Sequence, residues 1–419
     1  MNRQIAGVRG VAALLPADCA RWAAVEDRLR ALMEAYGFRE IRLPIIERTE
    51  LYGRAVGEVT DIVEKEMYTF LDRNGDSLSL RPEGTAGCVR AGIEAGLFHN
   101  QTQRLWYQGA MFRHERPQKG RYRQFHQWGV EVYGMAGAAI EAELIALGAR
   151  ILRELGVKAR LLVNSLGTPA CRERYRDALV EHLVAHRDRL DEDSVRRLER
   201  NPLRVLDSKN PAMKDVLDAA PMIADHWSAE SREHFASLKD HLSALGVAFE
   251  VAPRLVRGLD YYTHTVFEWA ADETLAQATI AAGGRYDGLV AELGGAATTA
   301  VGFAIGMERL MGLVTRLPQA AGLDVYVMTP AALQGRALGL AEALRDRGVR
   351  VETHLAAASP KSQGKRARES GARCIVEAVD EEGVAILGTG AIESGTVSWA
   401  QAAARISEIL GAEAKIHDQ

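Results

Sequence analysis

The pattern of hydrophobic and polar positions predicts helices and strands in the first third of the chain. Apolar residues recur at helical spacing from Asp18 to Tyr36, which predicts an amphipathic helix. A strand pattern follows from Glu40 to Ile46, and Pro44 within it indicates an edge or interface position. Apolar alternation predicts a strand from Leu78 to Leu80, and helical spacing returns from Ile140 to Leu155. This part of the chain therefore mixes helices and strands.

A long hairpin is predicted between Phe112 and Gly134. Residues alternate as in strands on both sides of a segment punctuated by Pro117 and Gly120, so we expect two antiparallel strands joined by a long loop. The loop is strongly basic, and its charged residues are Arg113, Glu115, Arg116, Lys119, Arg121 and Arg123. Because the net charge of the 419-residue chain is −4, this is a local cluster of cations, and its natural counterpart is a phosphate-bearing ligand.

Changes in composition divide the chain into four segments. From 170 to 245 the pattern is charge-rich and helical, which predicts a helical subdomain inserted between two parts of one domain, 1–169 and 246–316. A linker near 315–322 precedes residues 323–419, where strands alternate with helices. That alternation predicts a C-terminal α/β domain.

Composition argues against several classes of protein. With 47% hydrophobic and 26% charged residues, the chain resembles an ordinary soluble globular protein. The cysteines are far apart and form no CxxC pair, which argues against a disulfide framework or a structural zinc site: Cys19, Cys88, Cys171 and Cys374. We find no apolar run of about 18 residues and no signal-peptide pattern, so we expect a cytoplasmic protein without membrane contact.

Side chains of the predicted hairpin alternate between its two faces. Arg113 and Glu115 share a face of the first strand, and Phe125, Gln127 and Glu131 share a face of the return strand. A nucleotide fits this set, with Arg113 on a phosphate and Phe125 under the base. Gln127 and Glu131 then remain for a second, smaller ligand that bears N–H groups. The alternative is a solvated hairpin held by surface salt bridges.

Two further segments carry candidate binding residues. Glu83 and Thr85 lie in a loop after the strand at 78–80, where the alternative is that Thr85 only caps the next helix. Arg257 precedes Gly258 inside a strand pattern. A glycine at such a position indicates close approach of the backbone to a ligand, and the arginine beside it indicates that this ligand is an anion.

Three other features have a structural as well as a functional interpretation. Tyr261 and Tyr262 are adjacent in a strand pattern, so we expect them to face opposite ways and at most one to line a given pocket; core packing of both is the alternative. Arg309 follows GFAIGME and opens a predicted helix, whose N–H groups and dipole favour anions; a surface arginine is the alternative. The glycine-rich AGGRYDG matches no Walker or Rossmann fingerprint and predicts a tight turn.

Together these segments resemble those of class II aminoacyl-tRNA synthetases. YGFREIRLPIIE is similar to motif 1, FRHERPQKGRYRQF to motif 2 and GFAIGMERL to motif 3. The signatures of the histidyl-tRNA synthetase family are resembled by VGEVTDIVEKEMYTF followed by LRPEGT, by LVRGLDYYTHTVFEW and by AAGGRYDGL. The resemblance covers essentially the whole chain in the family's order.

The resemblance implies a fold and an activity. The fold would be α+β, with a six-stranded antiparallel sheet flanked by helices, a helical insertion and a C-terminal α/β domain that binds the anticodon. The activity would be ligation of histidine to tRNA(His) with ATP and Mg²⁺, in a homodimer, without metal ligands from the protein. The alternative is a histidine-sensing paralogue that resembles the regulatory subunit of ATP phosphoribosyltransferase. Such proteins have eroded arginines and no terminal domain, whereas Arg113, Arg257 and Arg309 are present here.

The resemblance also implies residue roles, which form three groups. The histidine substrate would be held by Glu83, Thr85, Gln127, Glu131, Tyr262 and Arg257. ATP would be held by Arg113, Glu115, Arg121, Phe125 and Arg309, with Arg113 and Arg257 as catalytic residues at the α-phosphate. The acceptor end of the tRNA would meet Arg116, Gln118 and Lys119 at the tip of the hairpin. His264 occupies a position that varies within its signature, and the resemblance gives it no role.

Overall fold

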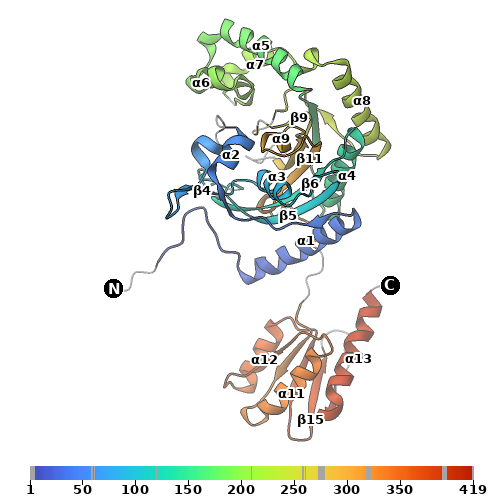
Figure 1. Ribbon diagram of the computed structural model, residues 1–419. Coiled ribbons are helices and arrows are strands. Elements are labelled where there is room, and N and C mark those ends of the chain that lie inside the picture. Colours follow the sequence, from blue (N-terminus) through green and yellow to red (C-terminus); the bar gives the residue numbers. More distant parts are fainter. Residues whose placement is uncertain are drawn as a thin grey trace. The chain divides into compact units, whose positions relative to one another are not determined.

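The computed structural model describes residues 5–57, 60, 62–118, 120–208, 210–256, 259, 261–271, 279–317, 322–388 and 394–417. The chain divides into two units, Met1–Pro318 and Gln319–Gln419. The first unit contains a large sheet and a small one, and the second contains a single sheet (Figure 1). Among the described residues, no helix is long and apolar enough to span a membrane.

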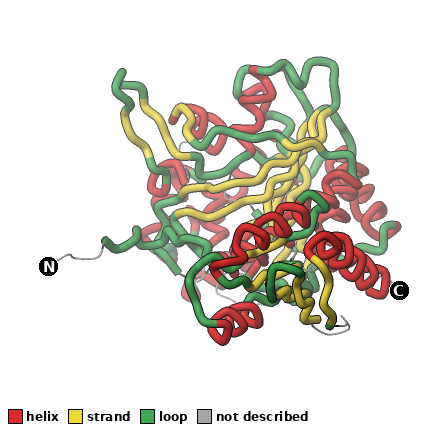
Figure 2. Tube along the Cα trace, turned by 90° about the horizontal axis from the view of Figure 1, so that it is seen from below, coloured by secondary structure: helices red, strands yellow, loops and turns green. Residues whose placement is uncertain are grey.

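An antiparallel sheet forms the centre of the first unit. Its inner strands are, in spatial order, β5 (Gln103–Phe112), β6 (Gln124–Tyr133), β11 (Ala300–Gly306), β10 (Thr279–Arg285), β9 (Thr263–Ala270) and β7 (Arg160–Ser165). A short parallel strand flanks each edge: β1 (Arg39–Glu40) pairs with β5, and β8 (Glu250–Val251) pairs with β7. Figure 2 shows the long strands of this sheet side by side. The predicted α+β class with a central antiparallel sheet is confirmed.

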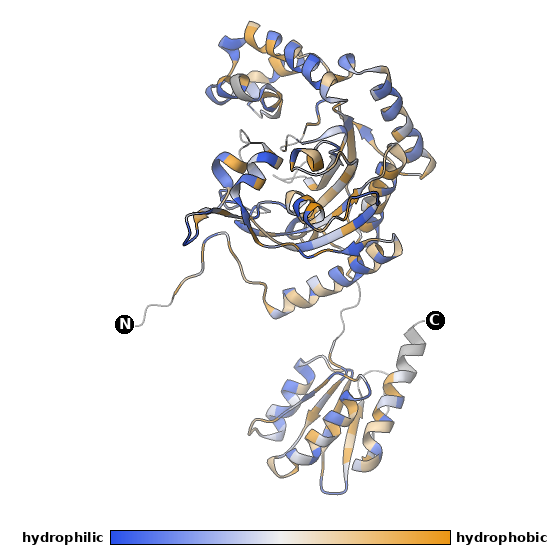
Figure 3. Ribbon diagram, viewed as in Figure 1, coloured by the Kyte–Doolittle hydropathy of each residue, from blue (hydrophilic) through white to orange (hydrophobic). Residues whose placement is uncertain are grey.

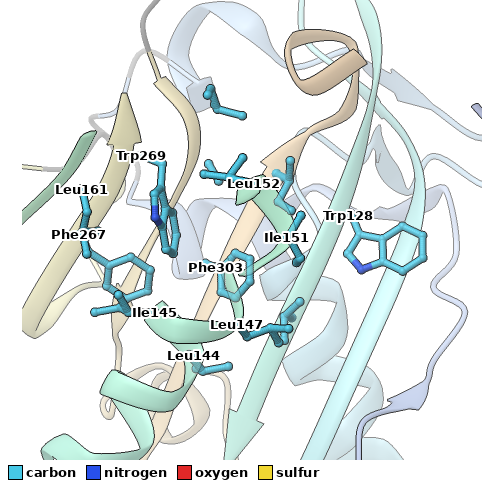
Figure 4. Close-up of a cluster of buried hydrophobic side chains, with 14 of the residues drawn as sticks. Trp128, Leu144, Ile145, Leu147, Ile151, Leu152, Leu161, Phe267, Trp269 and Phe303 are labelled. Carbon is cyan, nitrogen blue, oxygen red and sulfur yellow. The ribbon is translucent and has the colours of Figure 1, made fainter. Parts of the chain in front are cut away.

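Helices cover one face of this sheet. They are α1 (Pro16–Ala35), α4 (Ala138–Glu154) and α8 (Ala229–Ala244). Trp128, Val130 and Val132 of β6 pack into the core beneath them, because alternate side chains of a strand point to the same face. Figure 4 shows side chains of α4 in the same cluster as Trp128, Trp269 and Phe303. Full burial of each large apolar side chain contributes about 1.5–3 kcal/mol, so this core fixes which residues of β6 face the other way.

The opposite face of the sheet has a core of its own. It includes residues of α2 (Thr49–Val56), α3 (Thr85–Glu94) and α9 (Leu289–Glu292). A small sheet in the same unit has the order β2 (Ile46–Arg48), β4 (Ser77–Leu80), β3 (Thr69–Leu71). The single strand predicted from Glu40 to Ile46 is therefore wrong, since the chain leaves the large sheet after β1 and enters the small one at β2. Pro44 lies at this crossing, where its missing N–H costs no sheet hydrogen bond.

A helical segment connects β7 to β8. Its main helices are α5 (Pro169–Ala185), α6 (Glu192–Arg200), α7 (Lys214–Asp218) and α8. Side-chain oxygen atoms of Thr168, Asp191 and Ser228 cap α5, α6 and α8, each accepting a hydrogen bond from a backbone N–H of the first turn. The last of these helices, α8, packs against α4 and so returns the chain to the large sheet (Figure 1).

The second unit is built on a five-stranded sheet. Its strand order is β13 (Val351–Thr353), β12 (Val325–Met328), β14 (Cys374–Ala378), β15 (Gly383–Gly388) and β16 (Gly395–Ser398), and the first three are parallel. Helices α11 (Gln334–Arg345) and α13 (Trp399–His417) share one core, and α12 (Pro360–Glu369) contributes to another. The three inner strands, β12, β14 and β15, are largely hydrophobic (Figure 3). Strands and helices alternate here, as the sequence pattern indicated.

Candidate active site

A cavity lies on the face of the large sheet opposite α1, α4 and α8. It brings together residues from segments far apart in the sequence: Glu83, Thr85, Arg113, Glu115, Arg121, Phe125, Gln127, Glu131, Tyr262 and Arg309. Strand β6 supplies Phe125, Gln127 and Glu131, which share one parity because the odd-numbered side chains point away from the core. The cavity therefore collects every predicted histidine and ATP residue that the structure describes.

Glu131 forms the polar floor of this cavity. Its side chain is buried, and its carboxylate accepts hydrogen bonds from Thr85 Oγ1 at 2.8 Å, from Tyr107 OH at 3.2 Å and from Tyr286 OH. Burial raises the pKa of Glu131 to about 8, although the hydroxyl donors, Tyr286 first, oppose that shift. A carboxylate has about four acceptor positions, so room remains for an N–H donor of a ligand.

A glycine makes space for that carboxylate. Gly302 of β11 pairs with Glu131 across the sheet. A Cβ atom at 302 would lie 1.8 Å from Glu131 Oε2 and 2.6 Å from the carbonyl oxygen of Val130. Any side chain there would displace Glu131, so the glycine is a requirement of the pocket floor.

Glu83 lines the cavity and also caps a helix. Its carboxylate accepts the backbone N–H groups of Thr85 at 2.7 Å and Ala86 at 2.9 Å, at the start of α3. Burial raises the pKa of Glu83, and these two backbone hydrogen bonds act in the opposite direction. Glu83 and not Thr85 therefore caps α3, so the alternative that Thr85 only caps this helix is wrong, and both residues line the cavity.

An unpaired amide oxygen lies between the two ends of the cavity. Gln127 Oε1 is buried, and within the described part of the chain it has no hydrogen-bond partner. A buried acceptor without a partner carries a desolvation cost of about 1–3 kcal/mol. A ligand that donates an N–H to Gln127 would remove that cost.

Guanidinium groups line the other end of the cavity. Arg113 donates from Nε to the carbonyl oxygen of Pro82 at 2.9 Å, and its guanidinium carbon lies 5.3 Å from the ring centre of Phe125. Its two Nη atoms make no hydrogen bond to the described residues. Arg121 pairs with Glu115 at 3.0 Å. This end of the cavity is therefore cationic and is bounded by an aromatic ring.

Arg309 connects this end of the cavity to the hairpin loop. It is the third residue of the short helix α10 (Met307–Met311) and donates to the carbonyl oxygens of Gly120 at 3.1 Å and Thr279 at 2.8 Å. Burial lowers its pKa, and the charge of Glu115 opposes that shift. The surface-arginine alternative is wrong, because Arg309 is partly buried and lines the cavity.

The sequence prediction for the tyrosine pair is also wrong. Tyr261 and Tyr262 both line the cavity, with ring centroids 4.6 Å apart. Strand β9 begins only at Thr263, so the two-residue alternation of a strand does not apply to them. Both rings border the cavity, and both are also buried in the core on this face of the sheet, so the core-packing alternative is confirmed.

The remaining predicted residues fall into two groups. Arg257 and Lys119 lie outside the described residues. Arg116 and Gln118 are exposed and do not belong to the cavity lining. These two residues remain candidates for a ligand that approaches from solvent.

Three residues at the cavity, Tyr107, Tyr286 and Glu308, have no role predicted from the sequence. The ring of Tyr107 packs between Gly84 and Gly129, and its hydroxyl donates to Glu131. Cβ atoms at these two glycines would lie 2.2 and 2.1 Å from the ring, so side chains there would displace it. Glycines beside an aromatic residue on a neighbouring strand were the available signal. Glu308 also lines the cavity and accepts hydrogen bonds from the backbone N–H of His126, at 2.9 and 3.0 Å.

Comparison with known proteins identifies the family. A family model described as histidyl-tRNA synthetase matches residues 10–310. The histidine–tRNA ligase of Halorhodospira halophila is 54% identical over 386 residues, which are 91% of this chain and 91% of that protein. The chain belongs to the histidyl-tRNA synthetase family.

Solved structures agree with this assignment to the histidyl-tRNA synthetase family. The crystal structure of apo histidyl-tRNA synthetase from S. aureus has a TM-score of 0.81 and 33% identity, covering 96% of this chain and 100% of that chain. A protein from Bacillus halodurans C, described as an ATP phosphoribosyltransferase regulatory subunit/histidyl-tRNA synthetase, has a TM-score of 0.66 and 21% identity, covering 91% and 100%. The second likeness is one of fold alone, so the comparisons favour the synthetase over the regulatory-subunit alternative.

Glu131 makes the stability of this histidyl-tRNA synthetase family member depend on pH. Because the pKa of Glu131 is raised to about 8 in the ligand-free fold, the folded state holds this proton more tightly than the unfolded chain does. The associated stability is present at low pH and is lost as pH rises through about 8. Glutamine cannot ionise, so the variant Glu131→Gln should not lose this stability. We expect its free energy of unfolding in urea, relative to that of the wild type, to increase by at least about 1 kcal/mol from pH 6 to pH 9. A difference that stays constant with pH would contradict the raised pKa.

Proposed function

We propose that this protein is a histidine–tRNA ligase. In the first step it would join histidine and ATP to form histidyl-adenylate and release pyrophosphate. In the second step it would transfer the histidyl group to the 3′ end of tRNA(His). One observation carries the proposal: the guanidinium groups of Arg113 and Arg309 line the same cavity as Gln127 and Glu131. Phosphates and a small N–H donor can therefore meet in one place.

The first step develops negative charge at the α-phosphate, and guanidinium groups of the protein would stabilise that charge. The carboxylate of histidine attacks the α-phosphorus, the new oxygen–phosphorus bond forms, and pyrophosphate leaves. We assign Arg113 and Arg257 to the α-phosphate, because preorganised donors aimed at developing charge stabilise a transition state. The position of Arg113 is supported by its Nε contact with Pro82, which fixes the guanidinium.

The rest of ATP would lie along the basic hairpin. Phe125 is placed under the adenine, and the stacked Arg113 and Phe125 side chains would then hold adjacent parts of the same nucleotide. Glu115 and Arg121, already paired at 3.0 Å, would contact the nucleotide. Arg309 would take the γ-phosphate, which would compete with the carbonyl oxygens that Arg309 now binds.

Histidine would be selected at the carboxylate end of the cavity. Glu131 and Tyr262 are assigned to the imidazole, with Glu131 accepting an imidazole N–H. Glu83, Thr85 and Gln127 are assigned to the α-amino group; the unpaired Gln127 Oε1 supports this, since an ammonium would satisfy it. A side chain without an N–H would leave Glu131 unpaired, and sites of this kind reject such analogues by on the order of 10⁴-fold.

The donor set at the phosphate end is compatible with Mg²⁺ held mainly by ATP. This ion is usually bound by one or two carboxylates, substrate phosphates and water. Glu115 and Glu308 line the cavity and would provide those carboxylates. The described residues include no cluster of three possible metal ligands, so a cage made by the protein alone is not part of the proposal. Bound Mg²⁺ would supply charge neutralisation of the phosphates.

The remaining assignments concern tRNA and assembly. We place the acceptor end of tRNA(His) against Arg116, Gln118 and Lys119, supported by the exposure of the first two. We assign catalysis to residues 1–169 and 246–316, an inserted subdomain to 170–245, and anticodon binding to 323–419, whose exposed basic residues on α12 suit RNA. We also propose a cytoplasmic homodimer, as the family resemblance implies; the free cysteines suit a reducing compartment.

A single assay tests the activity. We expect the purified protein to catalyse ATP–pyrophosphate exchange that depends on histidine, and to charge tRNA(His) when that RNA is added. A histidine-sensing regulatory protein would bind histidine without exchange, and an RNA-binding module would do neither. Absence of exchange with 2 other standard amino acids is the control, for instance phenylalanine and glutamine at about 1 mM, a typical upper KM. Histidine binding without exchange would overturn the proposal.

A further inference from the structure

A buried ion pair lies on the α4 side of the cavity floor. Glu141 of α4 is fully buried, and its Oε1 accepts hydrogen bonds from His234 Nε2 at 2.8 Å and from Arg285 Nε. His234 belongs to α8, the last helix of the segment between β7 and β8, whereas Arg285 ends β10 of the large sheet. Burial acts to raise the pKa of Glu141, but His234 and Arg285 outweigh it and lower the pKa. Glu141 therefore carries its charge and depends on both partners.

Arg285 is the neighbour in sequence of Tyr286, which lines the amino-acid pocket. The side chain of Arg285 is buried, and it donates to the carbonyl oxygen of Gly137 at 2.9 Å and to Asp287 Oδ1 at 3.0 Å. The next residue, Tyr286, donates its hydroxyl to Glu131 and lines the cavity. The position of Tyr286 thus follows from the anchoring of Arg285.

His234 also contacts His264, which lies near the cavity tyrosines in the chain. Its ring lies against that of His264, with centroids 4.9 Å apart. His264 has a left-handed backbone (φ 48°), which is unfavourable for a residue with a side chain and persists only where neighbouring contacts determine it. Its backbone N–H donates to Gly167 at 2.8 Å, and its Nδ1 is buried without a partner among the described residues. Packing against His234 is therefore part of what holds this strained residue near the start of β9.

The strained residue His264 lies close to Tyr262 in the chain. One residue, Thr263, separates Tyr262 from His264, and the carbonyl oxygen of Tyr262 accepts a hydrogen bond from Arg172 of α5 at 2.9 Å. Both end helices of the inserted segment therefore contact residues that position the cavity tyrosines. Helix α5 binds the backbone of Tyr262, and α8 contacts Glu141 and His264.

We propose that His234 is a positioning residue for the amino-acid pocket, acting mainly through Glu141 and Arg285 on Tyr286, with a smaller contribution through His264 on Tyr262. It couples the packing of α8 to the affinity for histidine, and the inference rests on the function proposed above. A buried carboxylate that loses one partner forces its neighbours to rearrange, because the unpaired charge is costly. Such coupling is reciprocal, so histidine binding also stabilises the contact between α8 and α4.

Two substitutions at one position separate the contacts of His234. His234→Phe keeps a ring against His264 but removes the donor to Glu141. His234→Gln loses the ring but retains an N–H at a similar reach. The matched control is His241→Ala, an exposed histidine on the same helix whose side chain contacts Ser237 Oγ at 3.3 Å.

The measurements are histidine binding by titration calorimetry and the KM for histidine and for ATP in pyrophosphate exchange. For His234→Phe we expect Kd and KM for histidine to rise about tenfold, while KM for ATP changes less than about twofold. We expect His234→Gln to recover most of this loss and His241→Ala to match wild type. A role limited to folding would instead lower the melting temperature and affect histidine and ATP equally.

Three results would overturn the inference: unchanged histidine affinity in His234→Phe, equal losses for histidine and ATP, or a glutamine variant no better than the phenylalanine variant. Failure of the proposed function is distinguishable, because the wild-type protein would then show no histidine-dependent exchange. If wild type exchanges normally and the variants also bind histidine normally, only the role of His234 fails.

Discussion

Replacing Arg113 with alanine is expected to slow histidyl-adenylate formation by about 10²- to 10³-fold, the effect of losing one preorganised donor to a transition state. Arg113 is held by Pro82 and by the ring of Phe125, so its guanidinium needs little reorganisation when charge develops on phosphate. Pre-steady-state formation of pyrophosphate measures this step directly. We expect the affinity for histidine to change little, because Arg113 is assigned to phosphate.

The control for Arg113 lies at the other end of the same hairpin. Arg104 of β5 pairs with Glu143 at 2.6 Å and is partly exposed, so Arg104→Ala removes an equal charge without touching the cavity. We expect Arg104→Ala to form adenylate at nearly the wild-type rate, since such exposed pairs contribute about 1 kcal/mol or less. Equal rates in Arg113→Ala and wild type would remove Arg113 from the mechanism.

Removing the Glu131 carboxylate is expected to raise KM for histidine by about 10²-fold or more, since hydrogen bonds to charged groups contribute about 1.5–3 kcal/mol. The hydroxyl groups of Thr85, Tyr107 and Tyr286 lose their acceptor as well. In Glu131→Ala we expect KM for ATP to change less than about threefold, because the nucleotide residues lie at the opposite end of the cavity. Exchange assays with each substrate varied in turn measure both values.

A carboxylate outside the cavity provides the comparison for Glu131. Glu94 of α3 is exposed and pairs with Arg90, four residues earlier on the same helix. We expect Glu94→Ala to leave both KM values unchanged. If Glu131→Ala weakened histidine and ATP equally, the assignment of Glu131 to the imidazole would be refuted.

Local periodicity explains what the sequence could predict. The hairpin and the shared face of Phe125, Gln127 and Glu131 follow from the two-residue repeat of a strand, which needs no knowledge of the rest of the fold. The same rule failed at Tyr261 and Tyr262 because the strand begins one residue later. Boundaries of elements depend on long-range packing, so a repeat can be correct in kind and wrong at its ends.

Contacts between distant segments could not be predicted in this way. The donors to Glu131 come from residues 85, 107 and 286, and their convergence depends on how β5, α3 and β10 are arranged. The Glu141, His234 and Arg285 cluster joins α4, α8 and β10 and has no local sequence signal. Arg309 was predicted near a helix start, but its attachment to Gly120 requires the tertiary structure.

Gly302 constrains how this pocket can change in evolution. Because a methyl group at 302 and the carboxylate of Glu131 would occupy the same space, 1.8 Å apart, the two positions cannot vary independently. Gly302→Ala should be far more harmful in the wild-type background than beside Glu131→Ala, which is strong epistasis between paired strands. A change at 131 alone would not admit a side chain at 302, because the carbonyl oxygen of Val130 lies 2.6 Å from the same Cβ position. New amino-acid specificity would thus have to arise at 131 while position 302 stays glycine.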